Sequence, residues 1–194
     1  MRIEFKRPHK YTLDDSPIPS VTTILKVILG NQFDGIDPIY MQRGSAAHAL
    51  YELLGRGIDL NEYDYDHRLD GFVRGWRDWY RTLSPEIIGT VMRVGSRVHR
   101  YAGTLDLLCV LSGETTVVDY KATATSRDKY QLAAYTAALT ETEGINATQA
   151  VSVEIKPNGK WSMGKILSGA RLRQAKNEWV IIRKAAEIKE RLEK

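Results

Sequence analysis

The sequence predicts an α/β (α+β) fold in which a mixed central sheet is flanked by helices. Two observations carry this prediction. Apolar residues recur at helical spacing in the first part of the chain and again near its end, whereas Val- and Leu-rich segments between residues 90 and 121 alternate as strands do. No repeat, low-complexity tract or linker divides the 194 residues, so we expect a single domain over residues 1–194.

The first elements are a small hairpin and two helices. Residues 3–13 have the pattern of strands, and Asp14–Pro17 supplies a turn. Ser20 is a typical N-cap for a helix over residues 21–29. Helical spacing of apolar and small residues then predicts a second helix over residues 39–54.

The middle of the chain changes from helical to strand spacing. A third helix is expected over residues 66–82, and its aromatic residues align on one side, as core residues do: Phe72, Trp76, Trp79 and Tyr80. Residues 90–98, 102–111 and 115–121 then predict a three-stranded antiparallel meander. A helix over 127–141, two short strands around Pro157–Gly159 and a long helix over 169–192 complete the pattern.

The composition excludes some functions and permits others. Hydrophobic residues make up 43% of the chain, and the net charge of +4 permits an anionic partner such as nucleic acid without requiring one. The single cysteine, Cys109, rules out an internal disulfide and a multi-cysteine zinc site, and its apolar neighbours predict a core thiol. Neither a signal peptide nor a membrane span is recognisable, so we expect an intracellular, cytoplasmic protein with no membrane partner.

The strongest chemical signal lies on two neighbouring predicted strands. Strand alternation places Asp119 and Lys121 on one face, and Asp106 is the only charged residue in a strand that otherwise reads as buried. Two carboxylates beside a lysine suit a hard cation such as Mg²⁺ or Mn²⁺, with the lysine orienting a water or stabilising charge on phosphate oxygens. The alternative is an ordinary salt bridge of Lys121 with either carboxylate, and spacing alone does not decide between them.

The order of four motifs resembles that of a known superfamily. His48 is followed by Gly103-Thr104-Leu105-Asp106, by Asp119-Tyr120-Lys121 and by Gln131-Leu132-Ala133-Ala134-Tyr135. This series is similar to the motifs of PD-(D/E)XK nucleases of the RecB-like branch, and phage-type exonucleases are the most similar members. The resemblance extends from residue 19 to about residue 156.

The resemblance implies a restriction-endonuclease-like αβββαβ core and a division of roles. By this likeness, Asp106 and Asp119 hold the metal ion, Lys121 assists catalysis, and the backbone carbonyl of Tyr120 completes the metal shell. His48 corresponds to an additional metal ligand. Two further positions on the following helix correspond to residues that order the site or contact DNA: Gln131 and Tyr135.

One departure from the family pattern concerns a carboxylate. Many relatives carry a glutamate on the strand before the GTLD motif, where this chain has Val91 and Met92. Glu52, one helical turn after His48, or Glu86 could compensate.

Arginines close to the predicted strands offer phosphate contacts. Arg93, Arg97 and Arg100 put positive charge where DNA would enter the predicted site, although solvated strand arginines are an equal alternative.

The sequence thus predicts a metal-dependent DNA nuclease, and the resemblance favours an exonuclease, phage-encoded and acting in a bacterial host. Expected partners are DNA and either a second copy of the chain or a recombination or replication protein. One alternative is a catalytically weakened module that binds DNA or protein. A second alternative is a phosphatase or nucleotide hydrolase that uses the same metal chemistry on small phosphate esters.

Overall fold

The computed structural model describes residues 3–7, 10–31, 34–35 and 37–193, and it contains two sheets and five α-helices within those ranges. The small sheet has the order β1-β2-β3. Its strands are antiparallel and span the following residues: β1 (Ile3–Arg7), β2 (Lys10–Leu13) and β3 (Ser16–Ile18). The predicted hairpin is therefore extended by a third strand.

The central sheet has the order β4-β5-β6-β7-β8, and the short β9 also pairs with β7. Its strands are β4 (Glu86–Ser96), β5 (Tyr101–Leu111), β6 (Glu114–Lys121), β7 (Gln149–Ile155), β8 (Trp161–Met163) and β9 (Leu167–Ser168). All described pairings are antiparallel except that of β6 with β7. Parallel neighbours need a crossover connection, which α4 (Asp128–Glu143) supplies here.

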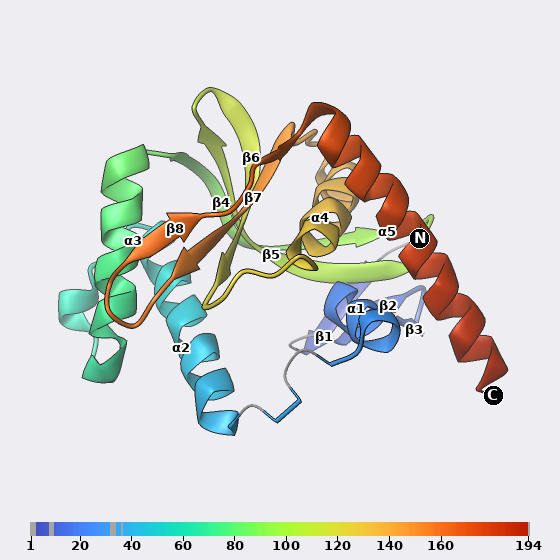
Figure 1. Cartoon of the computed structure of the whole chain (residues 1–194), viewed down its shortest axis with the longest axis horizontal. Coiled ribbons are helices and arrows are strands. Elements are labelled where there is room, and N and C mark those ends of the chain that lie inside the picture. The colour runs from blue at the N-terminus through green and yellow to red at the C-terminus, as the bar shows by residue number, and fades with distance from the viewer. Residues whose placement is uncertain (1–2, 8–9, 32–33, 36, 194) are drawn as a thin grey trace.

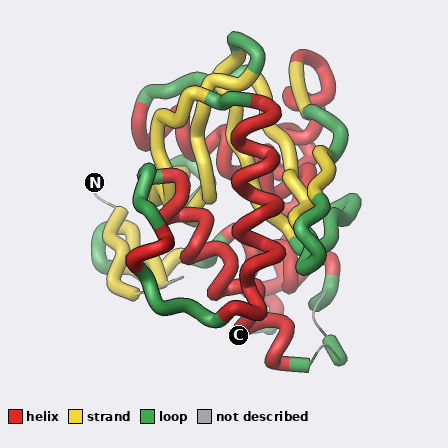
Figure 2. The backbone as a smooth tube through the Cα atoms, turned by 90° about the vertical axis from the view of Figure 1, so that its left-hand side faces the viewer, coloured by secondary structure: helices red, strands yellow, loops and turns green. Residues whose placement is uncertain are grey.

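Helices cover both faces of the central sheet, as Figures 1 and 2 show. On one side α1 (Val21–Leu29), α4 and α5 (Gly169–Leu192) form a hydrophobic core with β4, β5 and β6. On the other side α2 (Pro38–Gly55) and α3 (Asp70–Leu83) pack on β5, β6 and β7. The prediction of a mixed sheet flanked by helices is confirmed.

The small sheet joins the central one through the start of β5. Ala102 N donates to Pro19 O at 3.1 Å, and Ser20 forms an isolated parallel bridge with Ala102. Ser20 also caps α1, because its side chain accepts from Thr23 N at 3.0 Å. The N-cap prediction is confirmed, and the cap sets where α1 leaves the sheet.

Two predicted boundaries differ from the structure. Residues His67–Leu69 form a 3₁₀ turn that precedes α3, and Asp66 caps it by accepting from Arg68 N at 2.9 Å. Strand β4 begins at Glu86 and not at residue 90, and its register with β5 shifts between Ile87 and Gly89. The bulge interrupts the regular alternation, so the sequence pattern starts to read as a strand only after it.

Candidate active site

The site lies where two neighbouring strands separate. Strands β5 and β6 are paired as far as Leu107 and Val118. Beyond that pair, β5 remains paired with β4 and β6 with β7. Asp106 and Asp119 are the first residues beyond that last pair. Both carboxylates therefore stand at the fork, where backbone groups are released from the ladder.

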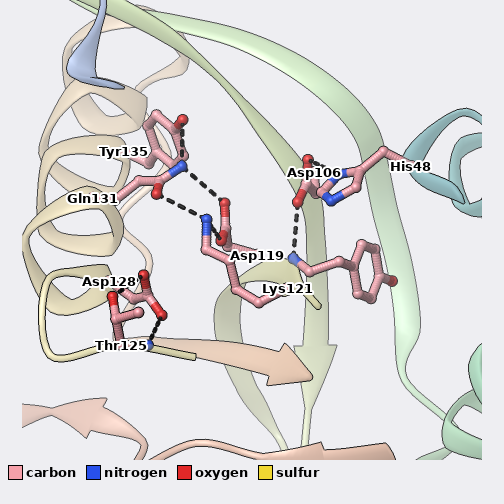
Figure 3. Close-up of polar contacts among 9 residues, drawn as sticks. His48, Asp106, Asp119, Lys121, Thr125, Asp128, Gln131 and Tyr135 are labelled. Atoms are coloured by element: carbon pink, nitrogen blue, oxygen red, sulfur yellow. Dashed lines mark hydrogen bonds and ion pairs between the residues drawn. The ribbon is translucent and has the colours of Figure 1, made fainter. Parts of the chain in front are cut away.

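The Asp106 side chain accepts a hydrogen bond from a backbone N–H that is no longer paired between β5 and β6. Its Oδ2 accepts from Tyr120 N at 2.8 Å, and its Oδ1 lies 3.2 Å from His48 Nδ1, as Figure 3 shows. The carboxylate thus bridges β6 and the middle of α2. Burial raises the pKa of Asp106, but His48 and the Tyr120 N–H lower it by more than burial raises it. The pKa of Asp106 is therefore below its usual value.

His48 reaches this carboxylate from the half-exposed side of α2. Burial lowers the pKa of His48, but the charge and hydrogen bond of Asp106 outweigh burial and raise the pKa. The structure therefore brings together the two residues that the sequence places 58 positions apart. The side chain of His48 is 40% exposed, so the imidazole can be reached from solvent.

Asp119 and Lys121 form the second half of the site with α4. Lys121 Nζ lies 2.6 Å from Asp119 Oδ2 and donates to Gln131 Oε1 at 2.9 Å. Gln131 Nε2 in turn donates to Asp119 Oδ1 at 3.1 Å and to the hydroxyl of Tyr135 at 2.9 Å. Figure 3 shows the four side chains converging from β6 and α4. The predicted shared faces, of Asp119 with Lys121 and of Gln131 with Tyr135, are confirmed.

The charges at the fork favour a further cation. Asp119 is only 3% exposed. Burial raises its pKa, Lys121 lowers it and Asp106 raises it, with a net value of about 6. Burial lowers the pKa of Lys121, but Asp119 raises it above its usual value, so the lysine stays charged. Asp106 is thus paired with His48 and Asp119 with Lys121, and a metal ion beside them would lower the cost of ionising Asp119.

The backbone of Tyr120 is held in place from the opposite face of the sheet. Its hydroxyl accepts from Trp76 Nε1 at 2.9 Å, and its ring packs against Tyr51 and Trp79. The ring of Tyr120 is buried in the core that α2 and α3 form with the sheet. Because this anchor fixes the backbone between Asp119 and Lys121, it also fixes where the Tyr120 carbonyl and N–H lie.

Sequence reasoning missed Asp128, which holds the loop after β6. Its two oxygens accept from Thr125 N at 2.7 Å and from Thr125 Oγ1 at 3.0 Å. The carboxylate also contributes to the raised pKa of Lys121, after Asp119. The signal was present in the sequence, since Thr125-x-x-Asp128 before a helix has capping-box spacing.

Other residues that the sequence suggested lie elsewhere. Glu52 pairs with Arg56 at 2.5 Å, and Glu86 stands opposite Val110 at the far end of β4 from Asp106. Neither carboxylate is hydrogen-bonded or ion-paired to a described residue of the fork, so the structure gives no support to either as a replacement for the missing glutamate.

The arginines near β4 are also spread out. Arg93 pairs in register with Thr104, two residues before Asp106. Arg97 N donates to Glu141 Oε2 at 3.0 Å, near the end of α4, about 15 Å along the helix from Gln131. The structure does not bring Arg97, or Arg100 in the same turn, to the entrance of the site.

Val91 occupies the position directly opposite Asp106. The register of β4 with β5 passes from Thr90 and Leu107 to Met92 and Leu105, so Val91 and Asp106 occupy opposite register positions between these two pairs. Val91 has φ +50°, a left-handed conformation that costs a β-branched residue energy. The register position opposite the candidate carboxylate is thus occupied by an apolar residue.

A metal ion would have to be held by few protein ligands. Among the residues that the structure describes, no three His, Cys, Asp or Glu side chains are placed to hold one. The donors at the fork are Asp106, Asp119 and the carbonyl of Tyr120, with His48 beside them. Such a set fits Mg²⁺ or Mn²⁺, which are bound through one or two carboxylates and keep several waters.

Comparison with known proteins adds no assignment. The chain matches no model of a protein family, and no curated protein matches it in sequence. Within the described part of the chain, no helix is both long and apolar enough to cross a membrane.

Proposed function

We propose that this protein is a metal-dependent DNA nuclease with a restriction-endonuclease-like core. One observation carries the proposal: two carboxylates, the buried Asp119 and the partly buried Asp106, stand together at the fork of the sheet, with Lys121 Nζ 2.6 Å from Asp119 Oδ2. The order of the His48, GTLD, DYK and QLAAY motifs supports the same function and favours an exonuclease. The substrate would be the DNA phosphodiester bond.

Each residue of the site has a distinct role in this proposal. Asp106 and Asp119, with the Tyr120 carbonyl and His48, would hold Mg²⁺ or Mn²⁺, which when bound polarises the phosphate and makes water a better nucleophile. Lys121 orients the attacking water and stabilises the negative charge that develops on the phosphate oxygens. Gln131 holds the side chains of Lys121 and Asp119 in fixed relative positions, because it is hydrogen-bonded to both.

The test uses end-labelled linear DNA, with a closed circle as a second substrate, in Mg²⁺ and in Mn²⁺. We expect cleavage of the linear DNA, and we expect Asp119→Asn and Lys121→Met to lose about 100-fold or more in rate. Lys160→Met, which changes an exposed lysine in the β7–β8 turn, is the matched control and should cleave at the parent rate. If folded Asp119→Asn cleaves as fast as the parent, the proposal is wrong.

A second candidate function is a nuclease-like module that binds DNA or protein without cleaving. The apolar Val91 opposite Asp106 and the small number of metal donors favour it. Calorimetry separates the two functions: the nuclease binds Mn²⁺ through Asp119, whereas an inactive module need not bind the ion. Adding a chromogenic phosphodiester to the cleavage assay tests whether small phosphate esters are the substrates instead.

A further inference from the structure

Helix α5 has a second apolar face that nothing in the described chain covers. Its buried face packs on the core through Leu172, Ala175, Trp179, Arg183 and Ala186. On the other side Ile181, Ile188 and Leu192 are exposed by 67%, 51% and 81%. We call these three residues, together with Ala185 between them, the α5 stripe. Figure 1 shows α5 along the outer edge of the molecule, with its C-terminal end extending past the other elements.

The spacing of the α5 stripe is that of a helix-pairing seam. Its members follow one another at intervals of four, three and four residues, the interval pattern of the core positions of a coiled coil. At 100° per residue the stripe is only about 60° wide, narrower than the face of about 100° or more that a helix buries against a broad surface. The exposed stripe also lacks the Trp or Phe that typically anchors a helix at a membrane surface.

The charges beside the stripe have one sign. Lys184 and Arg191 lie along one edge and Lys189 along the other, at the positions that flank a coiled-coil seam. Glu187 and Glu190 lie on the other half of the helix, and Glu187 pairs with Arg183 at 3.4 Å. Lys189 Nζ donates to Val27 O of α1 at 3.3 Å and also lies 3.9 Å from Glu193 in an exposed pair, which contributes little. The edges of the stripe are therefore basic.

We propose that the α5 stripe is the docking surface for an acidic amphipathic helix of a partner protein. Apolar residues of the partner would pack around Ala185, and its flanking carboxylates would face Lys184 and Arg191 along one edge of the stripe. A second copy of this chain fits less well, because paired stripes would bring lysines and arginines opposite one another. The inference does not depend on the nuclease proposal, since the stripe lies on the face of α5 turned away from the sheet.

The test uses the full chain and two synthetic peptides of three heptads. Both peptides carry Leu at the core positions, one has Glu at the flanking positions, and the other has Lys there. In fluorescence anisotropy we expect the Glu peptide to bind at least about tenfold more tightly than the Lys peptide, and to bind more weakly as salt is raised. Equal binding of the two peptides, or no binding of either, overturns the proposal.

Variants show whether binding occurs at the stripe. The double variant Ile181→Gln, Ile188→Gln changes only exposed side chains and should lose binding about tenfold or more while the circular dichroism of the chain is unchanged. Val98→Gln removes an equally exposed apolar residue from the β4–β5 turn and should bind like the parent. The proposal is also overturned if the double variant binds normally, if the free chain self-associates through the stripe, or if the stripe binds anionic vesicles and not the peptide.

Discussion

Asp119 shows at the scale of one residue why the fork of the sheet is the candidate site. Its carboxylate is nearly inaccessible, and burial together with Asp106 raises its pKa to about 6 against the opposing effect of Lys121. A buried acid with a raised pKa costs stability whenever it is ionised, so a structural role alone gives little reason to place a second carboxylate beside it. A metal ion between the two would offset that cost.

This raised pKa predicts how metal binding depends on pH. A carboxyl with a pKa of about 6, above its usual value, takes up a proton in the folded metal-free protein as the pH falls below 6. Because Mn²⁺ needs the ionised form, we expect protonation of Asp119 to lower its apparent affinity by up to about tenfold for each pH unit below 6. Calorimetry between pH 5 and 8 measures this, and an affinity that does not change over that range contradicts the assignment of Asp119.

Val91 gives a prediction about stability. Its positive φ is strained for a β-branched residue, and glycine adopts that conformation freely, so Val91→Gly should raise the free energy of unfolding by about 1 kcal/mol. The control, Val110→Gly on β5, changes a valine that has no positive φ, and it should lower stability by about 1 kcal/mol or more. Urea unfolding compares the two, and a loss of stability in both variants would show that Val91 is not strained.

The sequence predicted the residues of the site better than the bonds among them. Alternation along a strand is enough to place Asp119 and Lys121 on one face. The bond from Tyr120 N to Asp106 depends on where β5 and β6 stop pairing, which the sequence pattern does not show. The position of Arg97 likewise depends on how the β4–β5 turn meets the end of α4, a tertiary contact with no local signature.

At the scale of elements, α3 is locked to the sheet by close backbone contact. A Cβ at Gly71 would come 1.6 Å from Pro157 O in the β7–β8 turn, and one at Gly75 would come 2.7 Å from the side chain of Ile155. Since a backbone carbonyl cannot swing aside as a flexible side chain can, the first turn of α3 and the β7–β8 turn must move together. This contact holds α3 over the face of β7 that Ile155 helps to bury.

The contact predicts opposite effects at two helical glycines. Gly71→Ala should lower the free energy of unfolding by about 3 kcal/mol, because the methyl group has no room. Gly44→Ala in α2 has open space around the new methyl and should be neutral or stabilising by up to about 1 kcal/mol, since alanine favours helix. Thermal unfolding of both variants measures the difference. Equal melting temperatures would mean that α3 does not sit against this turn.

Elements with a long regular period were predicted best. The helix over 169–192 was placed with both ends correct, because its apolar repeat continues without interruption and nothing in its tertiary contacts opposes it. The start of β4 was missed because a bulge changes which residues face the core. The segment before α3 was read as helix because a capped 3₁₀ turn has nearly the same residue pattern as the first turn of an α-helix.

At the scale of the whole molecule, the first and the last α-helix pack on the same face of the central sheet. Helices α1 and α5 share a hydrophobic core with α4, and Arg127, just before α4, donates to Gly30 O at 2.8 Å and to Leu29 O at the end of α1. The loop that follows Lys121 is therefore fixed to α1. The packing of α1 against α4 therefore helps to position the loop beside the candidate site and also contributes to stability.

Arg183 is the polar contact through which α5 holds the β4–β5 turn. The residue is 4% exposed, its Nε donates to His99 O at 2.9 Å, and its Nη2 donates to Arg100 O at 3.3 Å. Arg183→Met keeps most of the apolar stem but leaves both carbonyls without this donor. Because the two hydrogen bonds are partly buried, we expect their loss to lower the free energy of unfolding by about 1–3 kcal/mol in total.

The matched control for Arg183→Met is Lys184→Met, which removes a positive charge from the neighbouring exposed position of α5. Urea unfolding should show the loss only for Arg183→Met, and amide hydrogen exchange should show faster exchange in the turn at residues 97–100. The effect should reach α4, because Arg97 N and Gly95 N both donate to side chains near its end. If the two variants unfold at the same urea concentration, α5 is held by its apolar face alone and the turn does not depend on Arg183.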